Sequence, residues 1–286
     1  MPIDLSLAVG AELPDVEFSW TATDVLLYHL GLGAGADPMD ARELTYVLED
    51  RLRVLPTFGV VAPNMRTFTP PALRFPGIEV DLAKVLYGTQ AITVLGPIPT
   101  EGTAVAKPRI VDVWDKGSAA VIVQEATITS ADGTDLWRSR AGLFVRGEGG
   151  FGGARGPSQR VDVPDREPDH VVEQRVLPQQ ALLYRLCGDR NPLHADPEFA
   201  ARAGFPRPIL HGLCTYGMTC KAVADAVFDG DPSRVTAISA RFAGVLFPGE
   251  TLRTRIWRDG ERMVVAGSCV EREDAAVLAD AVVTGG

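Results

Sequence analysis

The sequence of 286 residues predicts an α+β fold in which antiparallel strands wrap a buried helix, and it predicts this unit twice. Three observations support that prediction. Residues 110–147 and 234–283 alternate apolar and polar side chains, a pattern typical of antiparallel strands. Residues 211–231 are apolar on most sides, as expected of a helix that is buried all round. Residues 149–169 are rich in glycine, proline and charge and lie near the middle of the chain.

This central segment predicts the domain organisation. We expect an N-terminal repeat at 1–148, a linker at 149–169 and a C-terminal repeat at 170–286. Two such repeats would form one continuous sheet or a barrel-like pair.

A weak internal repeat supports the same division. Residues 25–38 align without gaps on residues 181–194 over the first half of that stretch, with a tyrosine and a leucine in common. The polar residues are not repeated, because Asp189 and His194 align with a glycine and a proline. We therefore expect the chemistry to lie in the second half.

The strands are expected to be joined by tight turns. Residues 110–147 break at Lys116-Gly117 and at Asp132-Gly133, and both pairs suit hairpin turns. The C-terminal strands contain a further hairpin at Asp259-Gly260. These breaks predict an antiparallel meander in each half.

The first half is less regular where the second half has its buried helix. Residues 40–54 predict an amphipathic helix, but residues 55–77 contain five prolines and cannot continue it. We therefore expect no complete central helix in this half, and the space left would hold a ligand.

Composition excludes several classes of function. Apolar residues make up 46% and charged residues 23%, which is typical of a globular protein, and the net charge of −9 argues against nucleic acid as a partner. No apolar run approaches the roughly 20 residues that span a bilayer, and residues 1–18 lack a basic targeting region. We expect a cytoplasmic protein without a membrane span. The spacing of the cysteines matches neither a zinc site nor a disulfide framework: Cys187, Cys214, Cys220 and Cys269.

The stretch "LCGDRNPLH", residues 186–194, concentrates polar chemistry. Pro192 prevents a helix from running through it, so we expect a loop that holds Asp189 and His194 on one side. A carboxylate and a neutral imidazole at close range can share one water, one group removing a proton and the other supplying one. This suits the addition of water to a polarised double bond, or its reverse. The alternatives are that Asp189 only forms a turn or caps a helix, and that His194 is a hydrogen-bonded core residue.

A second cluster lies at "RPILHGLCTYG", residues 207–217, where a loop becomes the buried helix. The first amides of a helix are free and carry positive partial charge, and Gly212 lets a ligand approach them. A thioester oxygen bound there would be polarised. We expect Cys214 to be inert packing, and His29 and His170 to be structural or surface residues.

"YRLCGDRNPLHADPEFA" and "GFPRPILHGLCTYG" resemble the signature of the MaoC-like (R)-specific enoyl-CoA hydratases, the hydratase 2 family. The likeness extends over nearly the whole chain and is to the two-domain type that includes the hydratase domain of peroxisomal multifunctional enzyme type 2. The resemblance implies a double hot-dog fold, catalysis by the C-terminal repeat, and an N-terminal repeat that has lost its central helix to admit a long or bulky acyl chain. It also implies hydration of trans-2-enoyl-CoA to (3R)-3-hydroxyacyl-CoA, and a homodimer. We expect no cofactor, and no metal because neither a His-Glu-x-x-His motif nor a paired cysteine spacing occurs.

The resemblance assigns site residues. Asp189 and His194 match the catalytic pair, Asn191 matches the asparagine that orients the loop, and Gly212 matches the oxyanion-hole glycine. The residues assigned to binding of the acyl-CoA are Tyr87, Gly88, Lys116, Arg190, Pro192, Leu193, His211 and Phe242.

Two of these binding residues carry a particular expectation. Tyr87 departs from the family, which usually has histidine there, so its side-chain contact is in question while Gly88 can still bind through its backbone. Lys116 would supply the local positive charge that an anionic ligand needs on an acidic protein.

Two other functions stay open at this point. A hot-dog thioesterase would release free CoA, and a non-catalytic subunit would bind acyl-CoA and turn nothing over. The sequence also leaves open which of Asp189 and His194 is the base, and whether the acyl group is straight, branched or a sterol side chain.

Overall fold

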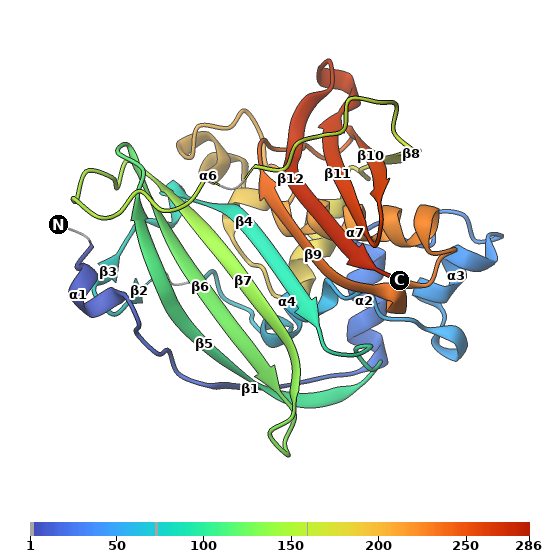
Figure 1. Cartoon of the computed structure of the whole chain (residues 1–286), viewed down its shortest axis with the longest axis horizontal. Coiled ribbons are helices and arrows are strands. Elements are labelled where there is room, and N and C mark those ends of the chain that lie inside the picture. The colour runs from blue at the N-terminus through green and yellow to red at the C-terminus, as the bar shows by residue number, and fades with distance from the viewer. Residues whose placement is uncertain (1–2, 72–73, 159) are drawn as a thin grey trace.

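The computed structural model describes residues 3–71, 74–158 and 160–286. One antiparallel sheet of ten strands crosses the molecule, and the helices lie behind it in the view of Figure 1. The N-terminal half contributes β1 (Val16–Trp20), β4 (Val85–Val94), β5 (Gly102–Asp115), β6 (Ala119–Thr129) and β7 (Asp135–Arg146). The C-terminal half contributes β8 (His170–Arg175), β9 (Val235–Phe242), β10 (Thr251–Asp259), β11 (Arg262–Cys269) and β12 (Ala275–Gly285).

The order of the strands shows that the two halves have the same topology. From the middle outward, the first half runs β4-β7-β6-β5-β1 and the second runs β9-β12-β11-β10-β8. The halves join where β4 pairs with β9, antiparallel, from Thr89 opposite Arg241 to Thr93 opposite Ala237. The internal repeat therefore produces one continuous sheet, the first of the two arrangements expected.

The predicted hairpins are confirmed. The turns after β5, β6 and β10 contain Gly117, Gly133 and Gly260, with φ of +86°, +87° and +64°. Positive φ is the conformation for which glycine carries no steric cost, and hairpin turns require it.

The predicted buried helix is also confirmed, as α7 (Gly212–Val227). It packs against β8, β9, β10 and β12, and twelve of its sixteen residues are buried. Beside it lie the equivalent short helices of the two halves, α2 (Ala22–Gly31) and α5 (Gln180–Tyr184), whose Tyr28 and Tyr184 rings are 6.1 Å apart. The remaining short elements are α1 (Leu5–Ala8), α3 (Ala41–Val47), α4 (Phe58–Val61), α6 (Pro197–Arg202), β2 (Arg74–Phe75) and β3 (Ile78–Glu79).

The helix predicted over residues 40–54 is shorter than expected. It ends at Val47, because Leu48 is extended, and only a 3-10 turn at Glu49–Arg51 continues it. The chain bends so that the amide of Leu55 reaches the buried ring of His29, at 3.2 Å, which a straight helix would prevent. The absence of a complete central helix in this half is confirmed, because the helical structure in the described part of the proline-rich segment is limited to α4 and one 3-10 turn at Ala62–Asn64.

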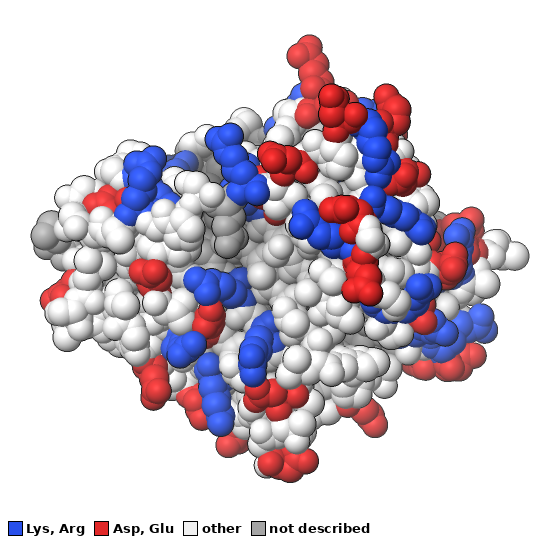
Figure 2. Space-filling model, in the orientation of Figure 1, with Lys and Arg blue, Asp and Glu red and all other residues white. Residues whose placement is uncertain are grey.

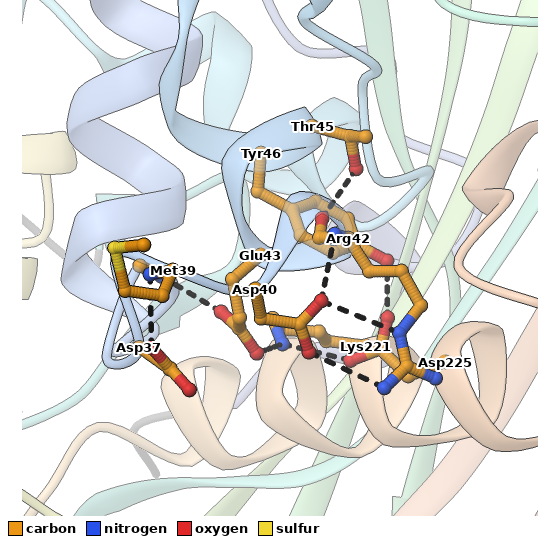
Figure 3. Close-up of polar contacts among 10 residues, drawn as sticks. Asp37, Met39, Asp40, Arg42, Glu43, Thr45, Tyr46, Lys221 and Asp225 are labelled. Atoms are coloured by element: carbon orange, nitrogen blue, oxygen red, sulfur yellow. Dashed lines mark hydrogen bonds and ion pairs between the residues drawn. The ribbon is translucent and has the colours of Figure 1, made fainter.

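A buried ion cluster fixes α7 to the N-terminal half (Figure 3). The ammonium of Lys221, on α7, lies 2.6 Å from Glu43 and 2.7 Å from Asp225, and its side chain is only 7% exposed. The hydroxyl of Tyr46 donates to Asp225 at 2.7 Å, and Glu43 also accepts the amide of Gly35 at 2.8 Å. Because a buried charge is costly without partners, this cluster fixes how α3 sits on α7.

All four cysteines are buried free thiols. Within residues 3–71, 74–158 and 160–286, no helix is long and apolar enough to cross a bilayer.

Candidate active site

The position of Asp189 is set by the glycine before it. A 3-10 turn at Arg185–Cys187 ends at Gly188, whose φ is +101°. A Cβ on Gly188 would lie 1.9 Å from the carbonyl oxygen of Asn64, so only glycine fits against this backbone. The loop that carries Asp189 is therefore pressed against a segment of the N-terminal half.

The rest of the loop is built by short hydrogen bonds. Asp189 accepts the amide of Asn191 at 3.1 Å, and Asn191 accepts the amide of Leu193 at 3.0 Å. Asn191 thereby caps a single 3-10 turn over Pro192–His194. No longer helix runs through the segment, as expected, and Pro192 begins this single turn, because the first residue of a helix needs no amide hydrogen.

His194 is held as a neutral imidazole. Its ring is 8% exposed, and its Nδ1 donates to the carbonyl of Ile209 at 2.9 Å, which leaves the lone pair on Nε2. Burial lowers the pKa of His194 below its usual 6.5, while the charge of Asp189 and the bond to Ile209 act in the opposite direction. A neutral imidazole with a free Nε2 can accept a proton from water.

His211 lies behind this pair. Its ring stacks on that of His194, with centroids 3.7 Å apart and planes at 25°, and its Nε2 donates to the carbonyl of Asp189 at 3.3 Å. Burial lowers the pKa of His211 well below 6.5, and its Nδ1 has no hydrogen-bond partner among the described residues. His211 thus contacts both members of the pair.

The start of α7 supplies free amides at the same place. The first hydrogen bonds of this helix run from Cys214 and Thr215 to the carbonyl of His211, so the amide of Gly212 precedes them. A Cβ on Gly212 would lie 3.1 Å from the ring of Phe242. The glycine therefore leaves the amide open beside an aromatic wall.

Asp189, His194 and Gly212 line one cavity of about 650 Å³ between the two halves. Its walls are mostly apolar and come from residues 60–71, 82–88, 124 and 143–144 on one side and from 187–215, 241–246 and 277 on the other. Eight of the predicted site residues line it: Asp189, Asn191, His194, Gly212, Tyr87, Gly88, Leu193 and Phe242. The ligand atoms of Asp189 and His194 lie within 4.8 Å of each other.

Four predicted residues do not line the cavity. His211 and Pro192 lie behind its wall, where they support the loop. Arg190 donates to the carbonyl of Thr67 at 3.3 Å. Lys116, in the turn after β5, lies over the ring of Trp114.

Tyr87 and Gly88 lie at an irregularity in β4. Opposite β7, Tyr87 pairs with Leu143 and Thr89 with Gly142, so Gly88 is the extra residue of a β-bulge. Its backbone is therefore released from this ladder beside the cavity. The ring of Tyr87 meets that of Phe242 edge-on at 6.2 Å, and burial raises the pKa of Tyr87, so its hydroxyl stays protonated.

Comparison with known proteins agrees with this geometry. The family model of the MaoC like domain matches residues 159–279, and that of the MFE-2 hydratase 2 N-terminal domain matches residues 18–147. The chain is 59% identical, over 97% of its length and 97% of the relative, to Enoyl-CoA hydratase ChsH3 of Mycobacterium tuberculosis. The chain belongs to the MaoC-like hydratase 2 family.

Solved structures confirm the fold class of this MaoC-like protein. The crystal structure of a MaoC-like dehydratase from Phytophthora capsici superposes with a TM-score of 0.88 at 28% identity, covering 99% of this chain and 98% of the other. A Mycobacterium tuberculosis protein described as a double hot-dog fold superposes with a TM-score of 0.56 at 11% identity, covering 99% and 98%. The α+β double hot-dog prediction is therefore confirmed.

Several polar cavity residues of this MaoC-like protein are absent from the sequence-based assignment, and three of them come from widely separated segments. Asn64 lies in the proline-rich segment, Gln124 on β6 and Arg241 on β9. Arg241 directly precedes Phe242, so the sequence pattern of a strand places it on the opposite face. Only the three-dimensional structure brings both residues to one cavity.

The same site contains a possible donor set for a metal. In the part of the chain that the structure describes, one group of three side chains could offer ligand atoms to a metal, and these atoms lie within 4.8 Å of one another: Asp189, His194 and His211. Ring lone pairs lie in the ring plane, and two rings stacked at 3.7 Å point them in parallel rather than at one ion. The arrangement suits proton transfer and does not fit a tetrahedral zinc centre.

Proposed function

We propose that this protein is an (R)-specific 2-enoyl-CoA hydratase, which adds water reversibly to trans-2-enoyl-CoA and yields (3R)-3-hydroxyacyl-CoA. One observation carries the proposal: Asp189, His194 and the first amide of α7 line the same apolar cavity. Its membership of the hydratase 2 family, and the enoyl-CoA hydratase among its relatives, support the same reaction.

In the proposed mechanism, one water lies between Asp189 and His194. Nε2 of His194 takes a proton from this water, and the oxygen bonds to C3 of the enoyl group. The C2–C3 double bond becomes an enolate, whose charge develops on the thioester oxygen and is stabilised by the amide of Gly212. Asp189 then acts as the general acid and delivers a proton to C2. The net result is H at C2 and OH at C3.

The stereochemistry follows from the loop. Because Asp189 and His194 come from one short segment and face one cavity, we expect both to act on the same face of the double bond, which gives syn addition. A proton then passes from His194 through water back to Asp189 and resets the site.

The proposed substrate has a long, branched or sterol acyl group, which would bind in the apolar cavity. Its N-terminal walls take the place of a complete central helix, since α4 is only four residues long. Turnover measured across straight, branched and sterol enoyl-CoA thioesters tests this part of the proposal.

The proposal includes a cytoplasmic location, which the four unpaired thiols support. It also includes a homodimer, which light scattering tests.

The main experiment follows the loss of trans-2-enoyl-CoA and determines the configuration of the product. Asp189→Asn and His194→Gln should each lower kcat by about 10²–10⁴-fold, the range for loss of a general acid or base. His170→Gln, at the start of β8, is the matched control and should retain activity. A (3S) product, or full activity in both site variants, contradicts the proposal, and release of free CoA thiol would indicate a thioesterase instead.

A further inference from the structure

The proposed substrate is an anion, because CoA carries phosphates, yet the chain has a net charge of −9. Lys116, the cation expected from the sequence, does not line the cavity. Among the described residues that do, Arg241 is the one lysine or arginine. A cation at this position needs an explanation.

Arg241 lies at the end of the pairing between β4 and β9, where the two strands separate. It pairs with Thr89 of β4 in the last register pair between the two halves, and β9 ends one residue later. Beyond this pair, Gly88 and residues 242–246 line the cavity from its two sides. Figure 2 shows one face of the molecule, on which lysine and arginine side chains are interspersed with acidic side chains around a shallow hollow.

Asp280 holds Arg241 in a defined orientation. Asp280 has φ of +51° at a register shift in β12, between Ala279 and Val282. Its carboxylate, 14% exposed, accepts Nε of Arg241 at 2.5 Å and the amide of Val161 at 3.1 Å. A left-handed aspartate inside a strand is unusual, and here it aims a carboxylate at an arginine.

This contact leaves the outer part of the guanidinium available. The hydrogen bond to Asp280 uses Nε, and neither terminal nitrogen of Arg241 bonds to a residue within the described ranges. The side chain is 48% exposed. A planar guanidinium that is fixed at Nε and free at both Nη atoms is suited to bind a phosphate with two parallel hydrogen bonds.

We propose that Arg241, oriented by Asp280, binds a phosphate of the CoA moiety at the opening between β4 and β9, and so selects CoA thioesters over thioesters that lack phosphate. The inference rests on the proposed function in that the thioester must reach Asp189 through this opening. It adds a binding residue that the sequence did not indicate.

Kinetics with three substrates test the proposal: an enoyl-CoA, the matching enoyl-phosphopantetheine and the matching enoyl-pantetheine, which has no phosphate. Arg241→Gln should raise KM for the enoyl-CoA about 5- to 10-fold, the loss expected for a half-exposed charge-assisted contact, with a much smaller change in kcat. The loss in kcat/KM should be smaller for enoyl-pantetheine. A loss for enoyl-phosphopantetheine equal to that for the enoyl-CoA places Arg241 at the pantetheine phosphate.

Two further variants separate binding from structure. Arg109→Gln removes an arginine that is paired with Glu125 at 3.0 Å and does not line the cavity, and it should behave like the wild type. Asp280→Asn keeps the left-handed backbone, which asparagine tolerates, and should raise KM in the same direction by a smaller factor. Equal losses for the enoyl-CoA and enoyl-pantetheine in Arg241→Gln would overturn the proposal.

A binding measurement keeps this inference separate from the proposed activity. Calorimetric titration with CoA itself needs no turnover, and Arg241→Gln should weaken CoA binding while Arg109→Gln should not. If the wild type binds CoA through Arg241 but hydrates no enoyl thioester, the proposed reaction fails and this inference stands. If CoA binds Arg241→Gln as tightly as it binds the wild type, this inference fails.

Discussion

Replacement of Gly188 by alanine is expected to damage both stability and activity. Gly188 has φ of +101°, and a new Cβ would lie 1.9 Å from the carbonyl oxygen of Asn64. Since Asp189 is the next residue, any shift that relieves this overlap moves the proposed catalytic carboxylate. The substitution therefore tests whether the two halves must touch here for the site to form.

The magnitude is the sum of two terms. An alanine at this φ costs about 1–2 kcal/mol relative to glycine, because its Cβ approaches the neighbouring backbone. The overlap with Asn64 involves backbone on both sides, which cannot rotate away as a side chain does, and overpacking of this kind costs about 1–3 kcal/mol. We expect Gly188→Ala to lower the free energy of unfolding by about 2–5 kcal/mol.

The matched control is Gly204→Ala. Gly204 also has a positive φ, +86°, but a Cβ there would meet nothing within 4 Å. It should therefore show the conformational cost alone, about 1–2 kcal/mol. Urea unfolding of both variants and of the wild type gives the difference, and hydration kinetics show whether kcat falls in Gly188→Ala only. If both variants lose the same stability and keep the same kcat, the contact with Asn64 has no role and the reasoning is refuted.

Three other predictions concern buried ionisable side chains. Burial lowers the pKa of His29 to about 4, so the unfolded chain binds more protons than the folded protein below pH 6.5, and the free energy of unfolding falls as the pH drops. Between pH 7 and pH 5 this histidine should lower the free energy of unfolding by about 2 kcal/mol. Urea titrations of His29→Gln should no longer show this dependence on pH. Lys221→Met should cost about 3 kcal/mol in the free energy of unfolding, since it leaves two carboxylates without their cation. Arg42→Gln is the control: Arg42 is exposed and pairs with Asp40, so this change should alter the free energy of unfolding by less than about 1 kcal/mol. Because burial lowers the pKa of His194, the acidic limb of kcat/KM against pH should lie below pH 6.5, and a limb above that value would show that His194 is not the base.

Local patterns in the sequence were sufficient for the elements and for the reactive loop. Period-two alternation and the turn pairs Asp132-Gly133 and Asp259-Gly260 determine hairpins through interactions between near neighbours. The apolar run at 211–231 likewise determines a helix buried on all sides. Asp189 and His194 are five residues apart, so the sequence already places both on one short loop.

Contacts between distant segments were decided by the tertiary structure alone. The carbonyl of Asn64 against Gly188 joins segments more than a hundred residues apart, and no periodicity in either segment indicates it. The sequence indicated Lys116 as the cation for an anionic ligand and did not indicate Arg241, but of the two only Arg241 lines the cavity, because β4 and β9 pair there and then separate. Local physics fixes which segments become strands, helices or turns, whereas the pairing of strands across the two halves fixes which side chains share a cavity.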